Sequence, residues 1–176
     1  RFGAAGLVPS RLEEASHTIQ TSLPEGPYAF NLIHSPAEDA IERAAAELFL
    51  KHHVKTVEAS AFLDLTPHIV HYRVNGLSQG PGEQVMIGNR VIAKISRSEV
   101  AEKFMRPPPE RILAKLLQEN RITETQARIA SRVPMADDIT VEADSGGHTD
   151  NRPLISLLPS ILSLRDRIPV SYTHLR

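Results

Sequence analysis

Carboxylates, two adjacent glycines and an imidazole stand together in the segment from Glu142 to Asp150. This segment directly follows a β-type run at residues 138–141. In α/β proteins the carboxyl ends of parallel strands carry ligands and catalytic groups. Gly146 and Gly147 let the backbone lie against a flat ring or a phosphate, and His148 can move a proton near neutral pH. The pattern therefore indicates a ligand site in which His148 acts on protons or forms hydrogen bonds.

A second interpretation of the same segment requires no ligand. Asp144 and Ser145 are both good helix N-caps, and an apolar helical run begins near Pro153. The segment would then be a solvated turn before a helix, and His148 would cap that helix or face solvent. The residues alone leave both interpretations open.

Polar residues also stand at the ends of the other predicted strands. Lys94 lies inside an apolar strand, where an unpaired ammonium group would be costly. It therefore either points into a polar site or forms a buried ion pair with Glu58 or Glu142. Asn31 can both donate and accept hydrogen bonds, which suits the edge of a cofactor ring, although Asn at a strand end is often only a turn residue.

The remaining histidines predict no metal site. His52 and His53 stand at a helix end, where a positive charge favours the helix dipole. His17, His68 and His71 are expected on helix surfaces. Because no third ligand at metal spacing accompanies His68 and His71, no metal is assigned.

The composition is that of an ordinary globular protein with one core. The chain has 176 residues, of which 41% are hydrophobic, with 20 basic and 21 acidic side chains. A net charge of −1 gives no reason to expect nucleic acid or an anionic membrane as a partner. No apolar run approaches the roughly 20 residues of a spanning helix. Zero cysteines exclude disulfides and fit a cytoplasmic protein.

Short apolar strands alternate with helices along the chain, which predicts parallel strands joined by crossovers. A doubly wound sheet and a β/α-barrel would both fit, and the polar residues at the strand ends favour the barrel. A complete barrel needs roughly 250 residues, so we expect a partial, truncated TIM-type β/α-barrel with a helical insertion. Strands are predicted at 28–33, 54–59, 90–95 and 139–141, helices at 10–22, 37–51, 66–75, 98–105 and 154–168, a loop at 78–88, and the insertion at 106–133 with helices at 110–119 and 123–131.

Both ends of the chain suggest an internal piece of a longer reading frame. Residues 1–6 read like the middle of a domain, entered at a glycine-rich turn. Residues 169–176 share no pattern with what precedes them, and their last six resemble translated adapter DNA. We therefore expect residues 1–168 to be the amino-side half of the barrel and residues 169–176 to be a non-native tail.

Five segments of the chain resemble the PfaD-type enoyl reductases, which are flavoproteins of polyunsaturated fatty acid synthases and trans-acyltransferase polyketide synthases. The family is related to the nitronate monooxygenases, also called 2-nitropropane dioxygenases. The resemblance covers nearly everything from Arg1 to Ile168, and its most specific part is the string from Asp144 to Pro153. The matching segments are residues 2–7, 30–36, 57–61, 91–96 and 141–153.

The resemblance implies an FMN-binding β/α-barrel that reduces the enoyl double bond of a thioester on an acyl carrier protein, with NADPH or NADH as the electron donor. Subunits of a polyunsaturated fatty acid or polyketide synthase are the implied partners. His148 takes the catalytic or substrate-contacting role of the family's Gly-Gly-His segment. The positions implied to contact or approach the cofactor are Gly3, Ala4, Asn31, Lys94, Glu142, Gly146 and Gly147.

The chain also departs from the wider superfamily. Nitronate monooxygenases carry a Gln or Glu at a fixed step before Gly-Gly-His, and Glu142 lies one position closer; they have Gly where this chain has Asp150. A reductase is therefore favoured over a nitronate monooxygenase, and a synthase component without catalytic activity is the third alternative. The glycine-rich loops that bind the FMN phosphate in this family are absent, so the 176-residue chain alone is expected to show little or no activity.

Overall fold

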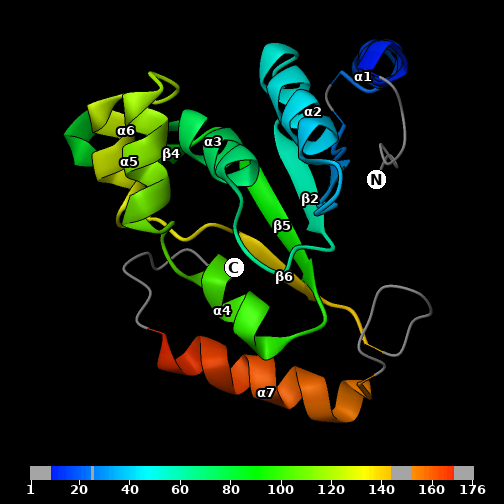
Figure 1. The fold of residues 1–176 in the computed structure, drawn as a ribbon, viewed down its shortest axis with the longest axis vertical. Helices are drawn as coiled ribbons and strands as arrows, with labels where there is room; N and C mark the ends of the chain where they lie inside the picture. The colour runs from blue at the N-terminus through cyan, green and yellow to red at the C-terminus, as the bar shows by residue number, and fades with distance from the viewer. Residues whose placement is uncertain (1–8, 25, 144–151, 169–176) are drawn as a thin grey trace.

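One parallel sheet organises the chain (Figure 1). The computed structural model describes residues 9–24, 26–143 and 152–168. Each strand of this sheet lies beside the strand that precedes it, so the order within the described residues never reverses as it does in a doubly wound sheet. The strands are, in order, β1 (Phe30–Ile33), β2 (Thr56–Ser60), β5 (Arg90–Ile95) and β6 (Asp138–Val141).

Helices connect these strands, as parallel pairing requires. The segment between β5 and β6 contains three helices, two of which were predicted at 110–119 and 123–131. Their status as an insertion at 106–133 stays a prediction. Among the described helices none is sufficiently long and apolar to cross a lipid bilayer. The helices are α1 (Pro9–Ser22), α2 (Asp39–Lys51), α3 (Pro67–Asn75), α4 (Ser98–Met105), α5 (Glu110–Gln118), α6 (Glu124–Ala130) and α7 (Leu154–Arg167).

The two faces of the sheet differ in polarity because side chains alternate along each strand. Phe30, Val57 and Val91 are fully buried and stand side by side in the register. Phe30 packs against Phe49 of α2, with ring centroids 5.4 Å apart, so this face lies against the helices. The residues that alternate with these along each strand point to the opposite face of the sheet, which carries the polar side chains.

Helix α3 starts and ends where its local sequence signals predict, but the reason for the glycine at its end differs from the expected one. The hydroxyl oxygen of Thr66 accepts a hydrogen bond from the Ile69 backbone N–H, and Pro67 begins α3 as predicted. Gly76 follows α3, but its φ is −82°, so a left-handed conformation is not the reason for glycine there. A Cβ at Gly76 would lie 2.4 Å from the backbone nitrogen of Asn89, and this close approach excludes any larger residue.

The loop predicted at residues 78–88 is a β-hairpin. Strand β3 (Leu77–Gln79) pairs antiparallel with β4 (Val85–Ile87) around the short 3₁₀ helix η1 (Pro81–Glu83). The backbone N–H of Gly80 donates to the carbonyl of Gln84 at 2.7 Å and closes the turn. Glycine and proline are turn residues here, and strands of three residues are too short to give a clear alternating pattern.

His68 and His71 are buried, which contradicts the prediction that they lie on a helix surface. Their exposed fractions are only 6% and 8%. Helix α3 lies between α2 on one side and α5 and α6 on the other, so it has no solvated face wide enough for either ring. His17, in contrast, is exposed on α1 as predicted.

The surroundings of His71 fix its neutral form. A guanidinium N–H of Arg121 donates to Nδ1 at 3.0 Å, so Nε2 carries the proton and donates to the Arg121 carbonyl at 3.1 Å. Burial, together with the positive charge of Arg121, lowers the pKa of His71 from 6.5 to about 4. The folded chain therefore keeps His71 neutral at pH values where the unfolded chain protonates it.

We expect the free energy of unfolding to fall as the pH drops from about 6.5 to about 4. The contribution of His71 is fully present above pH 6.5, and its loss amounts to roughly 3 kcal/mol at most, because one pKa unit corresponds to about 1.4 kcal/mol. Urea denaturation at several pH values measures it. His71→Gln keeps an N–H near the Nε2 position and cannot titrate. An equally steep pH dependence in that variant would show that another group is responsible.

Candidate functional site

Polar side chains gather on the face of the sheet that points away from the helices. Asn31 on β1 stands beside Glu58 on β2 in the register, and Lys94 on β5 stands beside Thr140 on β6. Ser60, two residues after Glu58, shares the same face. Parallel sheets normally bury apolar residues on both faces, so a polar face indicates a site and not only a core.

Asn31 begins a chain of two hydrogen bonds on this face. Its Nδ2 donates to Ser60 Oγ at 2.8 Å, and the Ser60 hydroxyl donates to Glu58 Oε1 at 3.3 Å. Asn31 is only 2% exposed, yet its Oδ1 receives no hydrogen bond from the residues that the structure describes. Leaving a buried acceptor without a donor costs about 1 to 3 kcal/mol. Such a group is rare in a folded protein, and it suits a ligand that brings an N–H or O–H.

Lys94 and Glu142 form the ion pair that was one of the two sequence interpretations of Lys94. Their Nζ and Oε1 atoms lie 3.0 Å apart, and the side chains are 16% and 24% exposed. Glu142 directly follows β6, and its backbone N–H donates to the carbonyl of Ile95 at 2.8 Å. The pair thus holds a cation in place at the carboxyl end of β5. Because an ammonium group has three N–H donors, Lys94 can still donate to a ligand while it contacts Glu142.

Three of the predicted site residues can be placed. Asn31, Lys94 and Glu142 lie on the same face, with Asn31 two strands away from the Lys94–Glu142 pair. The other five predicted residues lie outside the described part of the chain, and their roles stay predictions. They are Gly3, Ala4, Gly146, Gly147 and His148.

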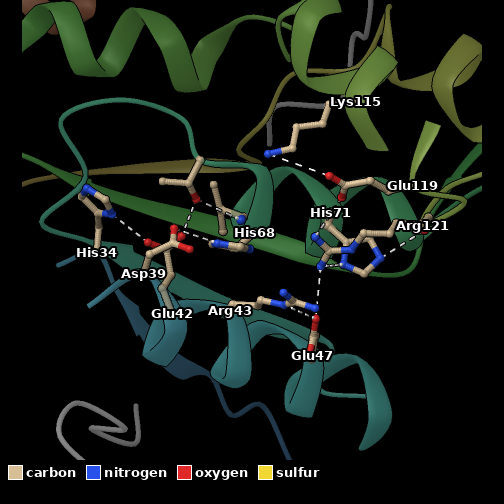
Figure 2. Close-up of polar contacts among 12 residues, drawn as sticks. His34, Asp39, Glu42, Arg43, Glu47, His68, His71, Lys115, Glu119 and Arg121 are labelled. Atoms are coloured by element: carbon tan, nitrogen blue, oxygen red, sulfur yellow. Dashed lines mark hydrogen bonds and ion pairs between the residues drawn. The ribbon is translucent and has the colours of Figure 1, made fainter. Parts of the chain in front are cut away.

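A second polar cluster lies where α2 and α3 begin, and sequence reasoning missed most of it. His34 Nδ1–H donates to Glu42 Oε2 at 2.7 Å (Figure 2). The Thr66 hydroxyl donates to Glu42 Oε1. Glu42 is 2% exposed and lies in the first turn of α2. The His34 ring stacks on Phe62 with centroids 5.3 Å apart. The one feature of the sequence that could have indicated this cluster is a carboxylate near a predicted helix start.

Comparison with known proteins finds close relatives for most of the chain, although no protein-family model matches it. It is 54% identical over 167 residues, 95% of the chain, to a polyunsaturated fatty acid synthase component of a Thraustochytrium species. It is 47% identical over 174 residues, 98% of the chain, to the polyketide biosynthesis protein PksE of Bacillus subtilis. By their names, these two relatives belong to polyunsaturated fatty acid and polyketide synthesis, respectively.

A solved structure shares the fold. It is the enoyl reductase domain of MlnA from the macrolactin biosynthesis cluster of Bacillus amyloliquefaciens, with a TM-score of 0.87 and 37% sequence identity over 94% of this chain. The chain spans only part of each of these proteins: 11% of the Thraustochytrium protein, 23% of PksE and 37% of the solved MlnA chain. The similarity therefore relates this chain to one portion of a reductase domain.

Proposed function

We propose that this chain forms part of an FMN-dependent enoyl reductase, which reduces enoyl thioesters on an acyl carrier protein in polyunsaturated fatty acid or polyketide biosynthesis. The carrying observation is the buried Asn31 Oδ1, which no donor from the described residues satisfies, on the same polar face as the Lys94–Glu142 pair. The similarity to the enoyl reductase domain of MlnA supports enoyl reduction as the chemistry at that face.

The arrangement of the sheet supports a partial β/α-barrel as its framework. The four strands follow one another in chain order, and the polar face lies opposite the helices, as on the inside of a barrel wall. An apolar groove of about 320 Å³ runs between β6 and α7, where Val141 and Leu158 are among the lining residues. Further βα units would cover this groove and continue the wall beyond β6.

The residues present fit a flavin ring. The edge of such a ring offers both N–H donors and carbonyl acceptors, and Asn31 Oδ1 supplies the matching acceptor. Lys94 supplies positive charge, which favours a reduced and more negative ring. When bound, FMN would supply the hydride for the β-carbon of the enoyl group, with NADPH or NADH as the electron source. Gly3, Ala4, Gly146 and Gly147 would allow the backbone to approach it closely.

The side chains of the chain would act on the substrate through charge and protons. His148 would donate a hydrogen bond to the thioester carbonyl and so stabilise the enolate that forms during reduction, or it would donate the proton that converts this enolate to product at the α-carbon. Glu142 would hold Lys94 in one position through their 3.0 Å contact. A preorganised cation costs no reorganisation when negative charge develops nearby.

The direct test uses the protein produced from its natural gene. We expect a yellow protein that converts a crotonyl thioester on acyl carrier protein to the butyryl thioester when NADPH or NADH is added. Mass spectrometry of the acyl carrier protein measures this conversion. Oxygen consumption with a nitronate and no acyl carrier would instead support a nitronate monooxygenase. A colourless protein that still binds its synthase would support a synthase component without catalytic activity.

Asn31→Leu should weaken FMN binding by about tenfold, because one hydrogen bond to a buried acceptor is worth about 1 to 1.5 kcal/mol. Fluorescence titration of the flavin-free protein with FMN measures the dissociation constant. Ser60→Ala is the matched control, since it removes the partner of Asn31 Nδ2 and leaves Oδ1 in place. Equal weakening by both variants would argue against a contact between FMN and Asn31 Oδ1.

A further inference from the structure

The loops that follow β1 and β2 form a rim that carries both polar and apolar side chains. The backbone N–H of His34 donates to the Ser60 carbonyl at 3.0 Å, so the two loops meet at the carboxyl end of their strands. Ile33 and Leu63 are 36% and 55% exposed. Between them, Ala61 has φ of +62°, a conformation that is uncommon for a residue with a Cβ. We call Ile33, His34, Ala61 and Leu63 the β1–β2 rim.

The imidazole of His34 is held in one tautomer. Both oxygens of the buried Glu42 accept hydrogen bonds, one from Nδ1–H of His34 and one from Thr66. In the neutral ring, a proton on Nδ1 leaves Nε2 with a lone pair. Figure 2 shows that the second ring nitrogen of His34 points away from Glu42. No described residue bonds to Nε2, so a fixed acceptor stands at the rim, on a ring that stacks against Phe62.

The charged groups near the rim are already paired, which favours a neutral ligand. Glu42 lies 2.7 Å from the His34 ring, Asp39 lies 2.9 Å from His68 Nε2, and Asp64 lies 3.1 Å from Lys103 Nζ, which also donates to the Leu63 carbonyl. A neutral N–H donor attached to an alkyl chain satisfies both features of the rim, since its methylene groups cover apolar surface and its N–H meets Nε2.

We propose that the β1–β2 rim binds the alkyl-amide arm that carries the thioester, with His34 Nε2 accepting a hydrogen bond from an amide N–H of that arm. This inference rests on the proposed function, because it takes the substrate to be an acyl thioester on a pantetheine-type arm. The rim lies on the carboxyl side of Asn31 and Ser60, so an arm bound there leads its thioester towards the polar face.

The experiment separates binding from reduction. Butyryl pantetheine, which is saturated and cannot be reduced, is titrated into the protein from its natural gene by calorimetry, and S-ethyl thiobutyrate serves as the ligand without an amide. His34→Asn keeps an N–H where Nδ1–H contacts Glu42 and removes Nε2. It should bind butyryl pantetheine about tenfold more weakly and S-ethyl thiobutyrate as the wild type does. His17→Asn, on the exposed surface of α1, should change neither affinity.

A rescue variant guards against a merely structural effect. His34→Gln brings an amide oxygen near the Nε2 position and should restore most of the affinity for butyryl pantetheine. The inference is overturned by equal affinities of wild type and His34→Asn, by equal weakening towards both ligands, or by a wild type that does not bind butyryl pantetheine. His34-dependent binding in a protein that reduces no enoyl thioester overturns the proposed function and leaves the rim as a binding site.

Discussion

Replacing Arg73 with methionine is expected to lower the free energy of unfolding by about 3 to 5 kcal/mol. Arg73 is 2% exposed and forms a bidentate pair with Asp137, with N···O distances of 2.7 and 3.1 Å. It also donates to the carbonyls of Asn89 and Pro134. The variant leaves a carboxylate and two carbonyls in a largely buried place without their donor, and such a loss exceeds the net value of the original pair.

The network around Arg73 connects α3 to the start of β5 and β6. Asp137 also accepts a hydrogen bond from the Val91 backbone N–H at 2.8 Å. Hydrogen–deuterium exchange of the β5 and β6 amides measures the local effect in the protein from its natural gene. Arg43→Met is the matched control, because Arg43 pairs with Glu47 on the exposed surface of α2, where solvent screens such pairs and they contribute little to stability. Similar exchange in both variants would contradict a special role for Arg73.

Hydrophobic alternation and turn residues predicted most of the fold. Strand β5 has the bounds that the sequence predicted, Arg90–Ile95, and the helices at 110–119 and 123–131 differ by only one residue at their ends. These elements carry strong local signals, such as the capping box at Thr123. The α/β class with a parallel sheet followed from the alternation of strands and helices, because parallel neighbours need crossovers, and the partial barrel stays a prediction.

Tertiary packing decided the features that the sequence did not predict. The burial of His71 depends on Arg121, which follows α5 and lies 50 residues later in the chain, and His68 contacts Asp39 of α2, 29 residues earlier. A polar residue on a helix is predicted to face solvent unless its neighbours in space are known. The same limit applies to Arg73, whose partner Asp137 is 64 residues away.

The sequence predicted that Lys94 needs a charged partner, but it did not predict the individual hydrogen bonds of the candidate site. The position of Lys94 in an apolar strand indicated a charged partner, and Glu142 was one of two candidates. The free acceptor of Asn31 was not predictable, because it depends on which atoms reach the amide: Nδ2 finds Ser60 and Oδ1 finds no described donor. Glu42 was missed although it lies eight residues from its partner His34. These contacts depend on how the side chains are oriented in the folded chain, which the order of residues in the sequence does not reveal.

His148→Ala in the protein from its natural gene should lower the turnover number for enoyl thioester reduction by about 10² to 10⁴, the usual value of a positioned acid or base. His148 lies outside the described residues, so this expectation rests on its sequence context and on the proposed function. FMN content, read from the visible absorption spectrum, should stay at the wild-type level. The measurement is the steady-state rate with a crotonyl thioester on acyl carrier protein.

The half-reactions distinguish the role of His148 from that of the flavin contacts. A group that acts only on the thioester leaves the reduction of FMN by NADPH or NADH unchanged and slows the reoxidation by the enoyl substrate. Stopped-flow absorbance follows both steps. Asn31→Leu should instead change FMN affinity, because Asn31 offers a hydrogen-bond acceptor and no proton. His17→Ala controls for the loss of an exposed imidazole. Unchanged reoxidation in His148→Ala would remove His148 from the mechanism, and the proton for the α-carbon would then have to come from another group.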